Sequence, residues 1–142
     1  MRKALLALLL ALPLPALAWQ EPERGTPLRA DLMDAVRPLL EWHLGPPIEI
    51  VVHSLRVEGD RAFVSAHAQR PGGAEIDMTA TPMARRGEYY PEASDGTTIQ
   101  ALLQQSGRMW VPVHWAVGAT DVWYQDAELC AGWRPVLTDI CN

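Results

Sequence analysis

The sequence predicts an α+β fold, in which one kinked N-terminal helix packs on a curved antiparallel sheet of about four strands. Three observations lead to this prediction: an apolar stripe at helical spacing, and then two strand–turn–strand patterns with a long irregular connection between them. This order, without helices alternating between strands, favours antiparallel pairing over a parallel sheet. The last segment carries both cysteines and is expected to form a disulfide-tied C-terminal tail.

The first 18 residues have the organisation of a secretory signal peptide. Two basic residues precede the apolar run 4–12, and an Ala-x-Ala cleavage motif ends at Ala18. The apolar run is too short to span a bilayer, and two prolines follow it. We therefore expect a secreted or periplasmic protein without membrane insertion after cleavage. A flexible leader is predicted at 19–25 and one domain at 26–142.

Composition narrows the classes of partner. Cleavage after residue 18 would leave 124 of the 142 residues, enough for one hydrophobic core. It would also change the formal charge from −5 to −7, because Arg2 and Lys3 are removed. An acidic chain without a basic cluster argues against nucleic acid as a partner. In an exported chain, Cys130 and Cys141 are expected to pair, and two thiols alone lack the ligands for a structural zinc site.

The helix is predicted from Thr26-Pro27, where a capping hydroxyl precedes a proline at the first helical position. Gly45, followed by two prolines, is typical of a helix end. Pro38 interrupts the pattern and predicts a kink, or two short helices that meet there. The apolar stripe consists of Leu28, Leu32, Ala35/Val36, Leu39/Leu40 and Leu44.

Four strands are predicted, at 48–57, 62–69, 99–104 and 108–118. Turn residues join the first two at 58–61, and Ser106-Gly107 joins the last two. The first strand carries apolar residues on both of its faces, and Phe63 and Val64 compete for the core in the second. In the last strand one face is wholly apolar and is expected to pack on the helix; its residues are Met109, Val111, Val113, Trp115 and Val117.

The connection 71–96 is long for a small domain, which is often a functional feature. A short edge strand is predicted at 75–79, and Thr81-Pro82 predicts a second, short helix. After the last strand, the tail is expected to cross the sheet with aromatic anchors at Trp123, Tyr124 and Trp133.

The order of elements resembles the cystatin/NTF2-like shapes, in which a bent sheet and a helix can enclose a pocket. Most of the mature chain is also similar to small secreted bacterial proteins of no assigned activity, in the runs LGPPIEIVVHSLRVEGDRAFVSAHAQRPGG, ALLQQSGRMW and VGATDVW. This chain departs from those relatives at Arg61, Pro112 and His114. The departures at the last two positions make any role of His114 specific to this chain.

Three histidines lie on predicted strands and are candidates for an open zinc or copper site: His53, His67 and His114. Metal-binding motifs such as H-x-H or H-E-x-x-H do not occur, so isolated histidines are the simpler interpretation. We expect no cofactor.

In an NTF2-like shape, an interior Asp and His can act as acid and base. The best pair is Asp121 with His114 or His53. Asp121 also ends a Gly-Ala-Thr-Asp turn, where structural capping is the simpler interpretation. A G-x-S-x-G nucleophile motif is absent from the sequence.

Aromatic residues indicate a binding surface. Trp115 is expected in the core, whereas Trp110 and His114 fall on the opposite face, where Tyr124 and the long connection would complete one patch. Tyr89 and Tyr90 form a second aromatic spot. The favoured function is therefore non-enzymatic binding of an envelope or extracellular protein, or of a small apolar ligand. An NTF2-like enzyme and an inhibitor of an envelope enzyme are the alternatives.

Overall fold

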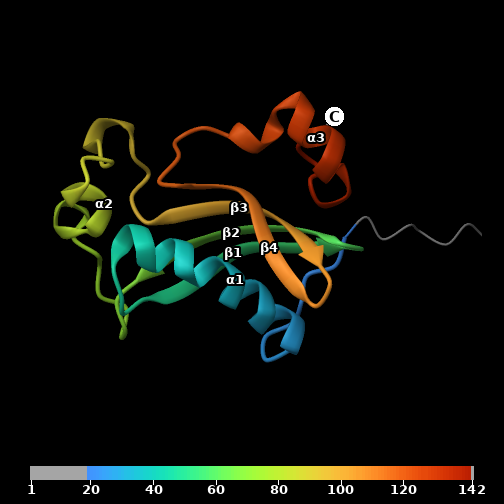
Figure 1. Cartoon of the computed structure of the whole chain (residues 1–142), viewed down its shortest axis with the longest axis horizontal. Coiled ribbons are helices and arrows are strands. Elements are labelled where there is room, and N and C mark those ends of the chain that lie inside the picture. The colour runs from blue at the N-terminus through green and yellow to red at the C-terminus, as the bar shows by residue number, and fades with distance from the viewer. Residues whose placement is uncertain (1–18, 142) are drawn as a thin grey trace, which may run out of the picture.

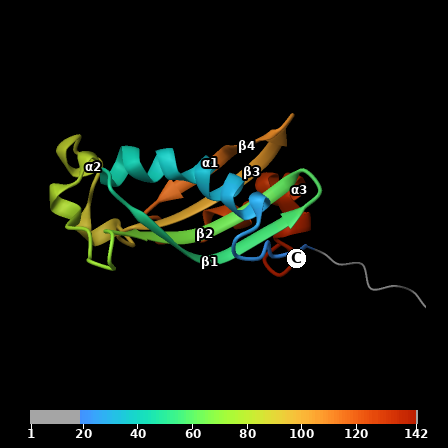
Figure 2. The ribbon, with the colours of Figure 1, turned by 90° about the horizontal axis from the view of Figure 1, so that it is seen from below.

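The computed structural model describes residues 19–141, so the expected signal peptide lies outside the described residues. Four antiparallel strands pair in the order β1-β2-β3-β4. Helix α1 covers one face of this sheet, and the C-terminal tail with α3 covers part of the other (Figures 1 and 2). The elements are α1 (Pro27–Leu44), β1 (Glu49–Glu58), β2 (Arg61–Gln69), α2 (Pro82–Arg85), β3 (Thr98–Ser106), β4 (Met109–Val117) and α3 (Ala127–Trp133). The predicted helix on a four-stranded antiparallel sheet is confirmed.

Helix α1 begins and ends at the predicted signals. The Thr26 hydroxyl accepts a hydrogen bond from the Arg29 N–H, and Gly45 ends the helix with φ 77° while donating to the Glu41 carbonyl at 2.9 Å. Pro38 is exposed and lies inside one continuous helix, so the alternative of two short helices is wrong. The buried face of α1 consists of Leu32, Val36, Leu40 and Leu44.

The main core lies between α1 and the sheet. Strand β2 presents mainly alanines to the helix, and these small side chains allow the helix to lie close to the sheet. Larger side chains from the neighbouring strands fill the remaining space. Sheet residues in this core are Leu55, Val57, Ala62, Val64, Ala66, Ala68, Ile99, Ala101, Leu103 and Trp110.

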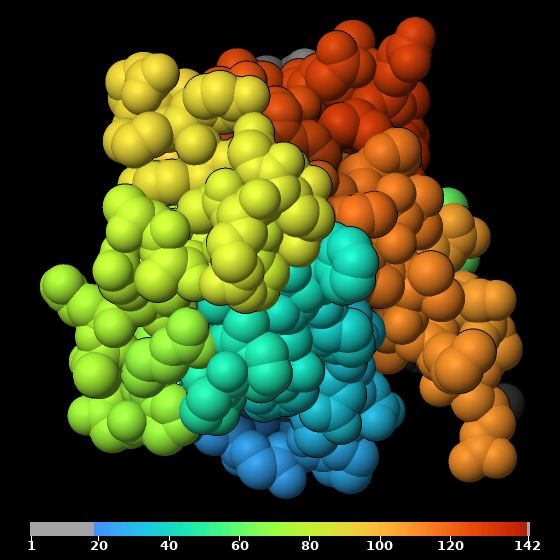
Figure 3. Space-filling model, turned by 60° about the vertical axis from the view of Figure 1, so that its left-hand side comes forward, coloured from blue at the N-terminus to red at the C-terminus, as the bar shows by residue number. Residues whose placement is uncertain are grey.

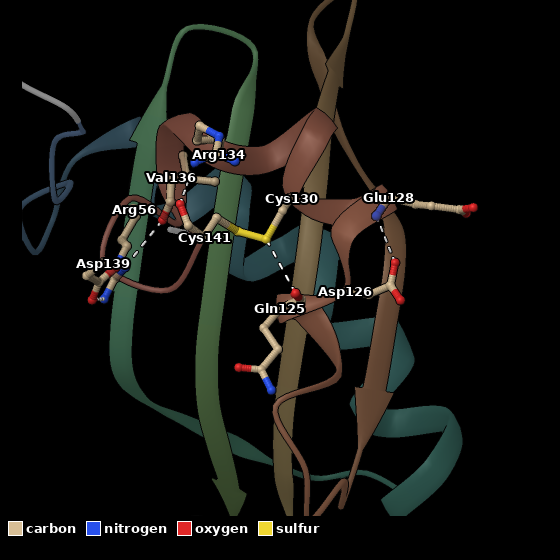
Figure 4. The surroundings of a disulfide bond; sticks show 9 residues. All are labelled: Arg56, Gln125, Asp126, Glu128, Cys130, Arg134, Val136, Asp139 and Cys141. Carbon is tan, nitrogen blue, oxygen red and sulfur yellow. Dashed lines mark hydrogen bonds and ion pairs between the residues drawn. A yellow bond between two sulfur atoms is a disulfide. The ribbon is translucent and has the colours of Figure 1, made fainter.

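A second, smaller core lies on the opposite face, under the tail. Phe63 and Leu102 point to this side. Both Phe63 and Val64 are therefore buried, on opposite faces of the sheet. The Cys130–Cys141 disulfide joins α3 to the last residues, as predicted (Figure 4). Arg56 of β1 pairs with the Asp139 carboxylate and thereby ties the tail to the sheet. Tail residues packed in this core are Trp123, Tyr124, Leu129, Cys130, Trp133, Val136, Leu137, Ile140 and Cys141.

Two β-bulges decide which side chains face which side. Val52 and Ser54 pair with consecutive residues of β2, which leaves His53 as an extra residue in β1. In the same way, Val113 is the extra residue in β4, between Pro112 and His114. An extra residue reverses the alternation of side chains beyond it. Both ends of β1 can therefore contribute apolar side chains to the same core.

The bulge in β4 overturns the prediction of one apolar face packed on the helix. Trp110 is only 7% exposed and packs in the core under α1. Trp115, expected in the core, is 44% exposed, and Val111 and Val113 are each 40% exposed. The strict alternation of this strand was therefore a poor guide to burial, because it assumed an uninterrupted register.

The long connection is largely packed against the domain. Residues 75–79 form no strand; a 3₁₀ turn at Met78–Ala80 takes that place, so the predicted edge strand is wrong. The second helix signal is confirmed, because the buried Thr81 hydroxyl accepts from the Ala84 N–H at the start of α2. Ile76 and Met83 anchor the connection in the main core.

The segment 19–25, predicted as a flexible leader, contacts the sheet at its first two residues. Gln20 exchanges two backbone hydrogen bonds with Val57, at 2.8 and 2.9 Å. The Arg56 guanidinium lies 4.8 Å from the centre of the Trp19 ring. The leader therefore adds a short bridge outside the end of β1.

Candidate functional site

The outer strand β4 carries four of the seven large hydrophobic side chains that are exposed within residues 19–141. The strand has nine residues and is paired on one side only, with β3. Its exposed side chains, which we call the β4 edge, are Met109 (68% exposed), Val111, Val113 and Trp115. Figure 3 shows the β3–β4 region, in orange, as a ridge at one side of the molecule next to α1 in cyan and blue. Clustered apolar exposure of this kind is uncommon on a monomer surface.

A groove lies beside the β4 edge on the side of the tail. This hollow of about 320 Å³ is lined by Val113, His114, Trp115, Trp123 and Leu129, and we call it the aromatic groove. The His114 ring stands at 85° to the Trp133 ring, with 5.2 Å between the ring centres. The buried indole N–H of Trp123 has no hydrogen-bond partner within residues 19–141. The groove therefore combines aromatic walls with one unused donor nearby.

A second groove lies beside the start of β4, against α1. This hollow of about 240 Å³ is lined by Asp31, Asp34, Ala35, Arg108, Met109 and Trp110, and we call it the acidic groove. Asp31 and Asp34 are one turn apart on α1 and both are exposed. The β4 edge is thus bordered by an aromatic hollow on one side and a carboxylate-lined hollow on the other.

The two edges of the sheet differ in how they are protected. Strand β1 carries charged residues at Glu49, Arg56 and Glu58, and Gln20 covers part of its edge. Strand β4 carries no charged residue between Met109 and Val117. Proline and bulges limit unwanted pairing at edges, and Pro112 with the Val113 bulge limits pairing at the middle of β4 only. The outer side of β4 is therefore the less protected edge.

The predicted aromatic patch does not form. Trp110 faces α1, whereas Tyr124 lies on the opposite side of the sheet, 4.9 Å from the Phe63 ring centre under the tail. Burial raises the pKa of the Tyr124 phenol, in agreement with this position. Tyr89 packs against the main core, and Tyr90 is exposed. Of the predicted binding residues, His114 lines the aromatic groove and Trp110 lines the acidic groove.

Two of the three candidate metal-binding histidines lie side by side, and the third lies elsewhere. His53 and His67 are in contact on β1 and β2, with 2.7 Å between Nε2 of His53 and Nδ1 of His67. His114 packs on the tail instead. Within residues 19–141, no three side chains of His, Cys, Asp or Glu are grouped so that they could hold a metal ion.

The predicted acid–base pair does not line a common hollow. Asp121 is exposed after the turn at Gly118. It does not line the aromatic groove that contains His114, and the other predicted partner, His53, lies on β1 in contact with His67. The two residues that the enzyme alternative needs are therefore not brought to one cavity wall in this arrangement.

Two other ionisable groups have shifted pKa values with clear causes. Burial lowers the pKa of His43, the nearby Arg86 lowers it further, and Glu88 opposes both. The hydrogen bond from Arg56 holds the pKa of Asp139 below its usual range. Both groups lie in structural contacts, between α1 and the long connection and between the sheet and the tail.

Sequence reasoning missed the exposed edge of β4. The available signal was Pro112, because a proline inside a strand indicates an edge strand. Within the described part of the chain, no helix is both long and apolar enough to cross a bilayer. Comparisons with protein-family models, with curated proteins and with solved structures found no match to this chain, so the resemblance to cystatin/NTF2-like shapes and to small secreted bacterial proteins stays a prediction.

Proposed function

We propose that this protein is an exported, non-enzymatic binding domain that accepts an extended, apolar segment of a partner protein along the β4 edge. The observation that carries the proposal is the uncharged and exposed outer strand with a groove on each side. The disulfide is compatible with an oxidising compartment, to which the expected signal peptide would direct the chain.

Strand addition explains why both the backbone and the side chains of β4 are accessible. An edge strand presents unpaired N–H and C=O groups, which an extended segment can satisfy as a fifth strand. Nine residues of β4 span about 30 Å, enough for such a segment to form several ladder hydrogen bonds. Alternate side chains of the added strand would point to opposite faces, towards the aromatic groove and towards the acidic groove.

Charge favours a different protein over a second copy of this chain. In an antiparallel pair of two complete β4 strands, Arg108 of each copy lies at the far end from Asp31 and Asp34 of the other. The carboxylates of each copy would then gain no basic partner from the other copy, beyond Arg108 of their own chain, and each mature chain carries an expected formal charge of −7. A partner segment with a basic residue at the acidic groove satisfies these carboxylates. The favoured partner is therefore an apolar strand with an Arg or Lys near one end.

The open shape of both grooves favours a protein segment over a small apolar ligand. Drug-sized ligands are usually enclosed over most of their surface. The aromatic groove is shallow and continuous with Trp115 at the edge, so it would cover a small ligand only in part. A segment that also pairs with the backbone does not need such enclosure.

The test is selection from a random 12-residue peptide library on immobilised protein, followed by Kd measurements on synthetic copies of the selected peptides. We expect apolar residues at alternate positions and a basic residue near one end. The binding variants are Val113→Lys and Trp115→Ala, and the control is Trp42→Ala, which removes an exposed tryptophan (64%) from α1. We expect the two β4 variants to weaken binding by about tenfold or more and the control to leave Kd unchanged.

Two further measurements test the role of the acidic groove and the place where the peptide binds. The double variant Asp31→Asn/Asp34→Asn is expected to bind a selected peptide more weakly than wild type does when the peptide carries its Arg or Lys. When glutamine replaces that Arg or Lys in the peptide, the double variant should bind it about as well as wild type does. Amide resonances of β4 should shift on peptide addition. No enrichment of peptides, equal binding by all variants, or a dimer that Val113→Lys converts to a monomer would each contradict the proposal.

A further inference from the structure

A second feature lies on β1 and β2, away from the β4 edge. In the register of these strands Val51 lies opposite His67, on the face that does not contact α1. His53, the extra residue of the β1 bulge, lies on the same side of the sheet as His67. The two rings stack with 4.8 Å between their centres. His53 is exposed and His67 half-buried, so both imidazoles can be reached by solvent.

Two imidazole nitrogens face each other in this pair. Nε2 of His53 and Nδ1 of His67 lie 2.7 Å apart, as in a hydrogen bond in which one neutral ring donates and the other accepts. Each nitrogen has a lone pair once it is deprotonated, and a metal ion can bind both from a position beside the line between them when the rings turn their lone pairs to the same side. The pair thus brings two possible ligand atoms together on adjacent paired strands, β1 and β2, rather than on a loop.

The nitrogen separation favours one coordination geometry. Two nitrogens at about 2.05 Å from one ion are about 2.9 Å apart at a right angle and about 3.3 Å apart at a tetrahedral angle. The observed 2.7 Å needs to open by only about 0.2 Å for adjacent positions of a square-planar site. A tetrahedral zinc site needs a larger movement. The geometry therefore suits Cu²⁺, which prefers tetragonal sites and heads the order of divalent affinities.

The surroundings suit a cation with open coordination positions. Glu49 lies two residues from Val51 on the same face of β1. Its carboxylate accepts hydrogen bonds from the Gln69 side-chain amide and from the Gly72 N–H. A hollow of about 420 Å³, lined in part by His67, Glu75 and Met78, lies beside the pair. Arg56, the nearest cation along β1, is engaged with Asp139 in the tail. Solvent can therefore complete the coordination, and local charge favours a positive ion.

We propose that His53 and His67 form a surface site for one Cu²⁺ ion, bound through Nε2 of His53 and Nδ1 of His67 with water in the remaining positions. This site does not depend on the β4 edge, and the two can be tested separately. Ni²⁺ and Zn²⁺ bind the same nitrogens more weakly.

The experiment uses the mature protein without a histidine tag, titrated with Cu²⁺ and separately with Zn²⁺ by calorimetry. The variants are His53→Asn and His67→Asn, and the matched control is His114→Asn, which removes a strand histidine outside the pair. We expect one copper site per chain in the wild type and the control. Each pair variant should weaken it by about tenfold or more, because the second imidazole binds intramolecularly. Unchanged circular dichroism shows that the variants fold.

Electron paramagnetic resonance of the copper complex gives a readout independent of affinity. We expect superhyperfine structure from two imidazole nitrogens in the wild type. Either pair variant should show one imidazole nitrogen. Absence of a one-to-one site, survival of the two-nitrogen spectrum in both pair variants, or tighter binding of Zn²⁺ than of Cu²⁺ would overturn the proposal.

Discussion

Replacing Trp110 or Trp115 by alanine tests the burial pattern of β4 directly. The two residues lie on the same strand and are the same in size, but Trp110 is 7% exposed and Trp115 is 44% exposed. A buried tryptophan removes about 200 Å² from water, which at about 25 cal/mol per Å² corresponds to about 4–5 kcal/mol for Trp110. Loss of this burial and of the packing under α1 leads us to expect that Trp110→Ala costs about 4 kcal/mol.

The same reasoning gives a smaller loss for Trp115. Its buried fraction accounts for about 2–3 kcal/mol as an upper bound, and solvent fills the space that the ring leaves. We expect Trp115→Ala to cost about 1–2 kcal/mol. At roughly 4 °C per kcal/mol, the two variants should differ in Tm by about 10 °C.

The assay is unfolding in guanidinium chloride followed by far-ultraviolet circular dichroism, because fluorescence changes when a tryptophan is removed. Equal m-values are required before midpoints are compared. Trp110→Phe provides a milder variant if Trp110→Ala does not fold. A Trp115→Ala variant that loses as much stability as Trp110→Ala would refute the exposure of Trp115, and with it the exposed β4 edge.

Three further predictions concern stability. Replacing Cys130 and Cys141 by serine should lower the free energy of unfolding by about 2.8 kcal/mol, because the 11-residue separation closes a loop of modest size; a urea midpoint equal to wild type would contradict this. The pKa of native His43 lies below its ordinary 6.5, so the unfolded chain takes up a proton first as pH falls. Stability should therefore decline as pH decreases below about 6.5, and urea midpoints of His43→Gln at pH 7.5 and 5.5 should show a smaller decline than wild type. Pro38 is exposed inside α1, so Pro38→Ala should raise Tm by restoring a helical hydrogen bond worth up to about 3 kcal/mol in helix propensity; a lower Tm would contradict this.

Local signals explain why the ends of α1 and α2 were predictable. A capping hydroxyl followed by proline acts through atoms within one turn, so Thr26 and Thr81 need no tertiary information. The disulfide was predictable for a different reason, since two cysteines allow only one intramolecular pair. The long connection was not predictable in this way, because its core contacts through Ile76 and Met83 depend on where α1 lies.

The alternation of apolar residues predicts the wrong burial for β4 and does not decide between Phe63 and Val64 in β2. Met109, Val111, Val113 and Trp115 share one parity in sequence, but the extra residue at Val113 breaks that parity in space. A bulge depends on the partner strand and on sheet twist, and neither can be read from nine residues of one strand. Phe63 and Val64 are both buried because the tail covers a second face of the sheet.

The amino-acid sequence by itself determined the fold class, the limits of α1 and the pairing of the cysteines, because each follows from local chemistry or from counting. Only the tertiary structure decided that Trp110 is buried, that the β4 edge lies between two grooves and that His53 meets His67. The physical reason is register: one unpaired residue in each outer strand changes the face of its neighbours, and that choice is made between strands.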